Sequence, residues 1–275
     1  MTQPPIYLLV RADDIGLSHA ANLACIDVFT RGICRSVELM APCAWFPEAV
    51  QLLHANPTYD VGVHLTMTSE WDNFKWGPIS GAQSIVNAAG FFHTRYRKRD
   101  DYPDEIVFEG SAWTPADVEK EFRAQIERVR KHIPWVSHLS THMGILRDDA
   151  IRGPIFKEVV DRLTTEYDLG VDLAAHGFER FRGFGENSQA LSAAEKVQQL
   201  RQNLETLAPG RWIFVDHPAY DQPETRAIHH AGYENVATDR QGVVDAWMDQ
   251  QVLEIVVAHG IQLVSYADVR HGKLA

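Results

Sequence analysis

The chain has 275 residues, of which 45% are hydrophobic and 23% charged, and its formal net charge at neutral pH is −11. This length and composition suit one large soluble domain, predicted over residues 1–275, and the acidic balance argues against a nucleic-acid partner. The first residues carry no basic run and the apolar run after them is short. We therefore expect no signal peptide, no membrane contact and a cytoplasmic location. Cys25, Cys34 and Cys43 match no zinc-ribbon spacing and are expected to be buried thiols.

The first third of the chain alternates between expected strands and helices. Expected strands cover residues 6–12, 36–40 and 59–67. The first of them is a mostly apolar run, which suits a central strand of a parallel sheet. Ser18 is placed to cap the helix after it, and Gly32 is placed to end that helix. This β-α-β-α-β order predicts a parallel sheet or barrel.

A long segment then interrupts the alternation. Residues 69–113 are rich in Gly, Asp and aromatic side chains, among them Trp71 and Trp76. A loop of this length inside a compact domain is usually functional or disordered, and the aromatic content argues against disorder. We therefore interpret the segment as an insertion that forms a lid or a wall of a binding site.

The second half of the chain returns to alternating strands and helices. Expected strands cover residues 136–144, 170–174, 212–215 and 261–266. Expected helices cover residues 115–132, a segment ending at 167, a segment ending near 207, and 241–258. The expected caps of the first three helices are Thr114, either Asp148 or Asp149, and Ser192. The chain thus contains about seven β-α units without a break in composition.

Residues 136–144, which read V-S-H-L-S-T-H-M-G, have an unusual pattern for a buried strand. His138, Ser140 and His142 stand two residues apart and would share one face of the strand. A row of two imidazoles and a hydroxyl is costly to bury unless something binds it. Taken alone, the pattern is as compatible with a pair of hydrogen-bonded core histidines as with a metal site.

Polar residues gather at the carboxyl ends of four expected strands, where the site of a parallel barrel lies. They are Asp13, Asp14, His64, His138, His142, Asp216 and His217. One carboxylate and two imidazoles form a common ligand set for a divalent ion such as zinc. We predict that these ligands are Asp14, His64 and His142, with Asp13 as general base and His217 as general acid.

The pair Asp13-Asp14 must lie on a turn if both carboxylates serve one site, because adjacent residues of a straight strand face opposite sides. Gly16 follows soon afterwards and makes such a bend feasible. The simpler alternative for the two aspartates is a turn followed by a helix cap. For His217 the alternative is a loop residue stacked on Pro218.

Five motifs, in one order, resemble the YdjC/ChbG family of carbohydrate deacetylases. They are R-A-D-D-I-G-L-S at 11–18, G-V-H-L-T at 62–66, S-H-L-S-T-H-M-G at 137–144, D-H-P at 216–218 and I-Q-L-V-S-Y-A-D-V at 261–269. The insertion is similar as well, in W-G-P-I-S at 76–80 and S-I-V-N-A-A-G-F-F at 84–92. The resemblance implies an α/β fold, a distorted (β/α) TIM-like barrel of about seven parallel strands with a long aromatic insertion.

Carried over position by position, the resemblance implies the roles already predicted for Asp13, His217 and the three ligands. The chain also departs from the family: Arg11 stands where Asn is usual, Ser140 where Asp is common, Gly144 where many members have His, and Ala219 where Gly is usual. These departures put the identity of the substrate in question. His138 is expected to support the site or the fold rather than to bind the metal.

The reaction that the resemblance implies is metal-dependent hydrolysis of an N-acetyl group on a sugar or short chitooligosaccharide-like substrate, with release of acetate. Zinc is the favoured ion, and magnesium or another divalent ion is the alternative. The candidates for contact with the sugar are Arg11, Trp71, Trp76, His138, Ser140 and His176. The two tryptophans could equally pack the insertion onto the barrel, and His176 is more simply a solvated loop residue.

Three other functions remain open from the sequence. The same ligands would serve a metal hydrolase that acts on another amide, an ester or a phosphoester. They would also serve a non-haem iron oxygenase, although the β-α order and the base beside the metal argue against it. A sugar-binding protein that has lost turnover would need neither Asp13 nor His217. The sequence does not decide the oligomeric state, and a homodimer is expected only by analogy with such enzymes.

Overall fold

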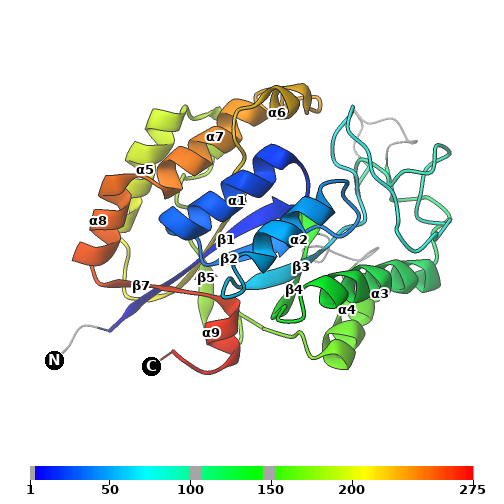
Figure 1. Ribbon diagram of the computed structural model, residues 1–275, viewed down its shortest axis with the longest axis horizontal. Coiled ribbons are helices and arrows are strands. Elements are labelled where there is room, and N and C mark those ends of the chain that lie inside the picture. Colours follow the sequence, from blue (N-terminus) through cyan, green and yellow to red (C-terminus); the bar gives the residue numbers. More distant parts are fainter. Residues whose placement is uncertain (1–3, 99–106, 145–152, 275) are drawn as a thin grey trace.

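The computed structural model describes residues 4–98, 107–144 and 153–274, and within them seven strands form one sheet. They are β1 (Ile6–Ile15), β2 (Ser36–Leu39), β3 (Val61–Leu65), β4 (His138–Thr141), β5 (Phe178–Arg180), β6 (Gly210–Asp216) and β7 (Ile261–Val264). All the paired strands are parallel, in the order β4-β3-β2-β1-β6-β5, with β7 paired to β1. The sheet curls into a half-barrel (Figure 1), which confirms the expected distorted (β/α) barrel.

Helices cover the sheet and group at its two sides. They are α1 (His19–Arg31), α2 (Phe46–His54), α3 (Pro115–His132), α4 (Gly153–Tyr167), α5 (Ala193–Glu205), α6 (Pro223–Ala227), α7 (Val236–Trp247), α8 (Gln250–Ala258) and α9 (Tyr266–Arg270). In Figure 1, α5, α7 and α8 pack together at one end of the molecule, and α3 packs on α4 at the other. Within the described residues, no helix is long and apolar enough to cross a membrane.

Local sequence signals fix several helix ends as expected. The hydroxyls of Ser18, Thr114 and Ser192 each accept a backbone N–H at the start of α1, α3 and α5. Gly32 ends α1, and α4 ends at Tyr167. The expected caps Asp148 and Asp149 lie outside the described residues.

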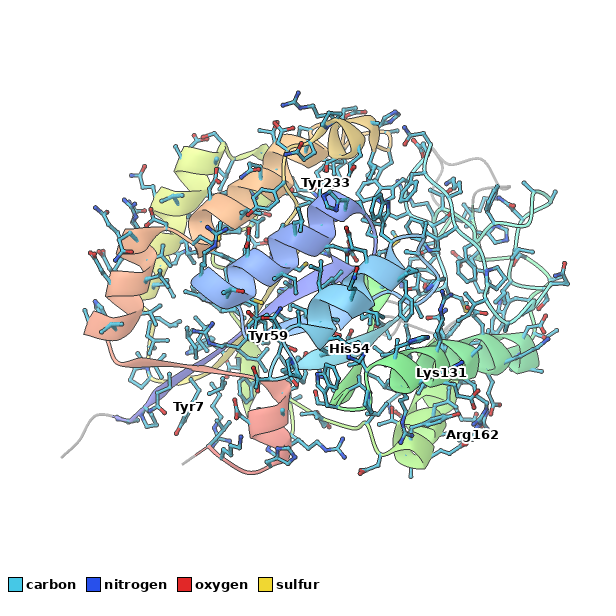
Figure 2. All side chains as sticks on the ribbon, viewed as in Figure 1. Tyr7, His54, Tyr59, Lys131, Arg162 and Tyr233 are labelled. Atoms are coloured by element: carbon cyan, nitrogen blue, oxygen red, sulfur yellow. The ribbon has the colours of Figure 1, made fainter. Side chains whose placement is uncertain are left out.

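β1 is the central strand, as its apolar sequence predicts. It pairs with β6 along one edge from Ile6 to Ala12. Along the other edge it pairs first with β7 and then, from Arg11 onward, with β2. Its side chains alternate between two cores: Leu8 and Val10 lie in the large core under the helices, whereas Tyr7 (labelled in Figure 2) and Leu9 lie in a smaller cluster on the opposite face. Arg11, the next residue on that second face, is therefore held between β6 and β2.

The expected strand over residues 170–174 is wrong, because none of these residues is in a strand and residues 173–177 form turns. The Asp172 carboxylate accepts the N–H of Ala175, and the Leu173 carbonyl accepts the N–H of Phe178. Local bonds of this kind compete with a strand ladder. The fifth strand begins instead at Phe178, where it pairs with β6.

The expected single helix over residues 241–258 is also wrong, because α7 and α8 meet within it. Helix α7 begins earlier, at Val236, and ends at Trp247. Asp249 then adopts an extended backbone and caps α8, with its carboxylate 2.9 Å from the N–H of Val252. A cap residue is not helical, so one continuous helix cannot pass through it.

The insertion is irregular in the parts that are described, residues 69–98 and 107–113, which contain isolated bridges but no helix or strand. Its aromatic side chains nevertheless form a core, since Trp71, Phe92 and Phe108 have no exposed surface. They belong to the same hydrophobic cluster as the barrel strands. The described parts of the insertion are thus packed onto the barrel.

Candidate metal centre

Three buried side chains from separate elements meet at the carboxyl end of the sheet. Asp14 lies near the end of β1, His64 lies on β3, and His142 opens the short helical turn η2 (His142–Gly144) after β4. One ligand atom from each lies within 4.8 Å of the others. The Asp14 Oδ1 atom is 3.7 Å from His64 Nε2 and 3.3 Å from His142 Nδ1. We call these three residues the metal triad.

The atoms that face one another in the metal triad are left without hydrogen-bond partners. Among the described residues, no partner exists for Asp14 Oδ1, for His64 Nε2 or for either nitrogen of His142. All three residues are at most 1% exposed. A buried polar atom without a partner is costly, and one carboxylate with two imidazoles is a donor set that suits a divalent ion. The residues present therefore fit the expected metal.

A backbone irregularity brings Asp13 to the same site. Asp14 has a φ of 74°, and the pairing of β1 with β2 shifts its register between Ala12 and Ile15. The N–H of Gly16 (φ 102°) then bonds to the buried Asn22 side chain at 2.6 Å. As a result, His64 Nε2 is 3.7 Å from an oxygen of Asp13 as well as from one of Asp14. The bend predicted at Asp13-Asp14 is therefore present as an irregularity within β1 rather than as a turn that ends the strand.

Each of the two carboxylates has its own arginine. Arg11 donates to both oxygens of Asp13, from Nε at 2.7 Å and from Nη2 at 2.8 Å. Arg240 of α7 donates to the outer oxygen of Asp14 at 3.1 Å. Burial acts to raise the pKa of Asp14, but contacts with His142, His217 and Arg240 outweigh it and hold that pKa well below its usual range. Asp14 is therefore ionised, as a metal ligand must be.

His217 faces Asp13 from the end of β6. Its Nε2 atom is 4.0 Å from Asp13, and its Nδ1 atom is 3.6 Å from Asp216. Burial acts to lower the pKa of His217, but the bond to Asp216 and the charges of Asp14 and Asp13 outweigh it and raise the pKa to about 9. The imidazole therefore holds a proton at neutral pH and can donate it to a group beside Asp13.

A row of buried polar groups lies behind His64. Its Nδ1 atom is 2.7 Å from the hydroxyl of Ser140, and that hydroxyl donates to Glu38. The other oxygen of Glu38 is 2.7 Å from His138 Nε2, and the His138 ring stacks on Tyr266 with centroids 3.6 Å apart. Burial acts to raise the pKa of Glu38, but His138 and Arg11 outweigh it and lower the pKa. Glu38 is thus an ionised carboxylate with no exposed surface.

Glu70, the second residue of the insertion, approaches the metal triad from the other side. Its carboxylate is 3.5 Å from His142 Nε2, and its φ is 32°. A left-handed backbone is uncommon for a residue other than glycine and marks a place that the surrounding structure holds fixed. The insertion thus supplies a carboxylate as well as aromatic side chains to the rim of the site.

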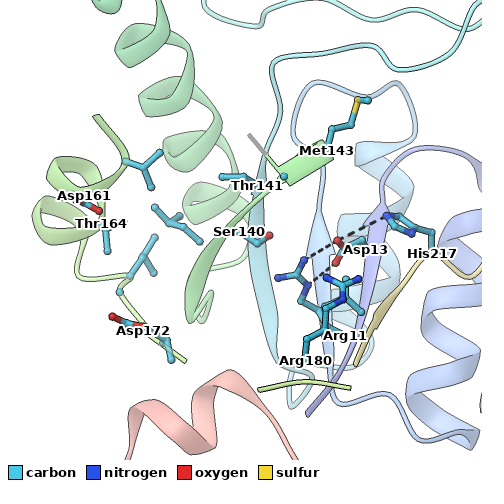
Figure 3. A pocket seen from close by; sticks show the side chains of 17 residues that line it. Arg11, Asp13, Ser140, Thr141, Met143, Asp161, Thr164, Asp172, Arg180 and His217 are labelled. Carbon is cyan, nitrogen blue, oxygen red and sulfur yellow. Dashed lines mark hydrogen bonds and ion pairs between the residues drawn. The ribbon is translucent and has the colours of Figure 1, made fainter. Parts of the chain in front are cut away.

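A cavity of about 510 Å³ opens from Asp13 and His217 toward the gap between β4 and α4. Figure 3 shows Arg11, Asp13 and His217 on one side of it and Asp161, Thr164 and Asp172 on the other. Ser140, Met143 and Arg180 also line the cavity. A volume of this size is in the range of small-molecule sites.

Of the residues predicted to contact the sugar, some lie at the cavity and others do not. Arg11 and Ser140 line the cavity. Trp76 is 6% exposed, with its ring 6.2 Å from that of His142, so it lies at the rim of the site. Trp71 has no exposed surface and stacks on His230 with centroids 5.6 Å apart. It packs the insertion onto the barrel, which is the alternative that the sequence left open.

The remaining two candidates lie away from the cavity. His138 has no exposed surface and lies beneath the site, in contact with Glu38. His176 was predicted to follow the fifth strand, but it precedes β5 and is exposed, and its carbonyl accepts a bond from Arg211 near the start of β6. It therefore lies at the amino end of the sheet, opposite the metal triad. The strand error of residues 170–174 is the cause of that misplacement.

Sequence reasoning missed Glu38, Glu70 and Arg240 as parts of the site. The one available signal was Glu38, a charge in the middle of a short strand that is buried on both faces. Neither Glu70 in the insertion nor Arg240 in the middle of a helix differs in pattern from a surface charge.

Comparisons with known proteins agree on one family. The model of a family described as YdjC-like protein matches residues 7–258. Carbohydrate deacetylase 1 of Listeria innocua is 28% identical over 62% of this chain, and the match spans 60% of that relative's length. Carbohydrate deacetylase 2 of the same organism is 23% identical over 95% of this chain and 98% of its own length.

One solved structure shows the same fold. It is described as a cellobiose-phosphate cleavage protein from Enterococcus faecalis V583. The two structures superpose with a TM-score of 0.72 at 22% sequence identity, over 96% of this chain and 99% of that chain. The half-barrel and its insertion therefore form a fold that is already known from a solved structure.

Proposed function

This chain belongs to the YdjC-like protein family, and we propose that it is a metal-dependent deacetylase. Its substrate would be an N-acetylated sugar or a short, chitooligosaccharide-like oligosaccharide, and acetate would be the product released. The names of the curated relatives support this reaction class. The match to the first of them covers 60% of its length, so the activity is proposed for this chain on the evidence of its own site.

The observation that carries the proposal is that a candidate base, Asp13, and a candidate acid, His217, lie beside the metal triad. His64 Nε2, one of the orphaned atoms of the metal triad, is 3.7 Å from Asp13, and His217 Nε2 is 4.0 Å from the same aspartate oxygen. A protein that only binds sugar needs neither an acid nor a base next to a metal site. Hydrolysis of an amide needs both, because water must lose a proton and the amine must gain one.

A divalent ion held by Asp14, His64 and His142 would supply Lewis acidity at the amide carbonyl and lower the pKa of the attacking water. Asp13 accepts the proton of that water on its carboxylate, which Arg11 holds in one orientation through two bonds. His217 donates its Nε2 proton to the departing amine, and Asp216 keeps the ring protonated through Nδ1. An amine leaves poorly without that proton, so acid and base are both required.

Two imidazoles with one carboxylate favour zinc over magnesium, which prefers oxygen ligands and retains several waters. Zinc is therefore the ion that we propose. We also propose that residues 1–275 form one domain, because the insertion and the strands share one hydrophobic cluster. The homodimer and the cytoplasmic location remain predictions.

The test combines metal analysis with an assay of product. Purified protein is expected to hold about one equivalent of divalent metal and to release acetate from diacetylchitobiose. Chelation should stop the release, and returned zinc should restore it. The variant Asp14→Ala should lose metal and activity together. The exposed Asp245 of α7 provides the matched control, and Asp245→Ala should keep both.

Other outcomes identify the rival functions. Bound metal without acetate release, together with hydrolysis of an ester or phosphoester, would assign a different hydrolase. Sugar binding without any product would assign a binding protein. Full activity in Asp14→Ala would refute the ligand set itself.

A further inference from the structure

The hydroxyl of Ser140 connects a buried carboxylate to a ligand of the metal triad. Its oxygen is 2.7 Å from His64 Nδ1 and bonds at the same time to Glu38. A hydroxyl has one proton, and a carboxylate can only accept. The proton of Ser140 therefore points to Glu38, and its oxygen must accept a proton from His64 Nδ1. This arrangement places the neutral tautomer's hydrogen on Nδ1 and leaves the lone pair on Nε2.

The lone pair of Nε2 is the one that faces the metal triad. His64 Nε2 is 3.7 Å from Asp14, and among the described residues it has no hydrogen-bond partner. The opposite tautomer would put a hydrogen on Nε2, and a protonated nitrogen cannot bind a metal. The carboxylate and the hydroxyl behind His64 thus select the tautomer that a ligand needs.

The register of three neighbouring strands builds this row of groups. Glu38 of β2 pairs with Gly62 of β3, and Gly62 pairs with His138 of β4. Two residues further along, His64 of β3 pairs with Ser140 of β4. The four side chains therefore lie on one face of the sheet, and rigid strands rather than loops hold them.

Gly62 provides the space that the row occupies. A Cβ atom at this position would lie 2.3 Å from the Oε2 atom of Glu38 and 2.5 Å from the Nε2 atom of His138. Any larger side chain would displace the carboxylate from Ser140. The glycine of β3 is therefore a packing requirement of Glu38, because only a hydrogen fits between these two polar groups.

We propose that Glu38 is a positioning residue for metal binding, which acts through the Ser140 hydroxyl to fix the tautomer and orientation of His64. This inference rests on the ligand set of the proposed function. Groups that hold the second nitrogen of a metal-bound imidazole typically contribute 10- to 100-fold in metal affinity or activity. Here the Glu38 carboxylate holds the imidazole of His64 through the Ser140 hydroxyl, and the other oxygen of Glu38 contacts His138.

The first test measures zinc affinity of the full-length chain by competition with a chromogenic chelator. Ser140→Ala and Glu38→Gln should each weaken zinc binding by about 10- to 100-fold. The double variant should be no weaker than the weaker single variant, because both changes interrupt the same path. Wild-type affinity in both single variants would overturn the proposal.

Ser36→Ala is the matched control. Ser36 lies on the same strand as Glu38 and is also buried, but its hydroxyl has no hydrogen-bond partner in the described part of the chain. Its loss should leave zinc affinity unchanged within about twofold. An equal loss of affinity in Ser36→Ala would show that any small change in β2 or β4 disturbs the site, and the proposal would then be wrong.

A second measurement reads the tautomer directly and does not depend on metal binding. Long-range ¹H–¹⁵N spectra of the chelated protein should show His64 protonated at Nδ1 in the wild type, and a shift of the proton toward Nε2 in Ser140→Ala. A wild-type His64 protonated at Nε2 would refute the inference. If no form of the protein binds zinc, the proposed function fails, whereas the spectra still decide whether Glu38 and Ser140 set the tautomer.

Discussion

Two buried clusters of charge in this molecule differ in how completely their atoms are satisfied. Between α5 and α7, the Lys196 ammonium lies 2.7 Å from Asp239, and the hydroxyl of Tyr233 (labelled in Figure 2) donates to the other oxygen of that carboxylate. Both oxygens of that carboxylate therefore face a protein partner, and Lys196 meets Oδ1 as an ion pair and not as a hydrogen bond. In the metal triad, one atom of each residue (Asp14 Oδ1, His64 Nε2 and His142 Nδ1) faces the other two and has no hydrogen-bond partner among the described residues. Buried charge alone therefore does not mark a site, whereas orphaned donor atoms that converge do.

The largest effect should come from breaking the metal triad. His142→Gln should reduce acetate release to the level of chelated wild type, because a ligand is lost. The stability of the metal-free protein should fall less than it does when the Lys196–Asp239 pair is broken, because Asp14 keeps its bond to Arg240 when His142 is replaced. Metal analysis, acetate assay and chemical denaturation measure the three quantities. Retained metal with full activity would contradict the ligand assignment.

Removing the acid should separate binding from turnover. His217→Ala should keep its metal but lower kcat by about 10²- to 10⁴-fold, the usual contribution of a general acid. The exposed His259 at the end of α8 is the matched control, and His259→Ala should leave kcat unchanged. A loss of metal in His217→Ala would move His217 from the acid role into the ligand set.

Breaking the Lys196–Asp239 pair should affect stability and not chemistry. Lys196→Met leaves Asp239 as a buried charge without its cation, and such a loss costs about 3–5 kcal/mol of unfolding free energy. Replacing the exposed Lys157, which pairs with Asp161 on α4, should change stability little. Urea denaturation gives both values. Folded Lys196→Met protein should release acetate at the wild-type rate, and a lower rate would show that the two clusters are coupled.

Chelation should destabilise only a protein that can bind metal. An ion present at about 100 times its dissociation constant stabilises the folded state by about 2.7 kcal/mol. Wild-type protein should therefore melt at a higher temperature with zinc than with a chelator, and His142→Gln should melt at one temperature in both. Calorimetric scans make this comparison, and an equal zinc effect in the two proteins would place the ion elsewhere.

The smallest effect should be a shift in the pH profile. The pKa of His217 is raised from 6.5 to about 9: burial opposes the rise, and Asp216, Asp14 and Asp13 outweigh it. The stabilisation from these contacts is complete below pH 6.5 and is lost as pH rises through about 9. Acetate release should fall over the same range, as His217 loses its proton. Asp216→Asn should move this basic limb to lower pH by about one unit, and an unchanged limb would assign it to another group.

The sequence predicted the parts of the site that follow from strand order. Asp14, His64 and His142 could be expected together because the carboxyl ends of parallel strands share one edge. The bend at Asp13-Asp14 could be expected because two adjacent carboxylates had to serve one site. The central place of β1 followed from its apolar run. These features follow from the periodicity of apolar residues and from the order of strands and helices, and both can be read from the sequence.

The features that the sequence did not predict depend on contacts between residues of different strands and helices. Glu38 reaches Ser140 only because β2, β3 and β4 lie in a particular register and Gly62 leaves room between them. Arg240 reaches Asp14 only through the packing of α7 on the sheet. The error over residues 170–174 has a local cause, since Asp172 stabilises a turn in a segment whose apolar pattern is that of a strand. Periodicity contains no information on any of these contacts.

The pairing of β1 along both edges has a consequence for the order in which parts of the molecule unfold locally. Its backbone is bonded to β6 on one side and to β7 and then β2 on the other. Amide hydrogens in such a strand exchange with solvent only in the largest opening events. The segment of β1 that leads up to Ala12, just before Asp13 and Asp14, is therefore expected to be among the most slowly exchanging parts of the described chain. Deuterium should enter the described parts of the insertion and the turn after α4 long before it reaches this segment, and a partly unfolded molecule should still keep the paired strand that leads into the site.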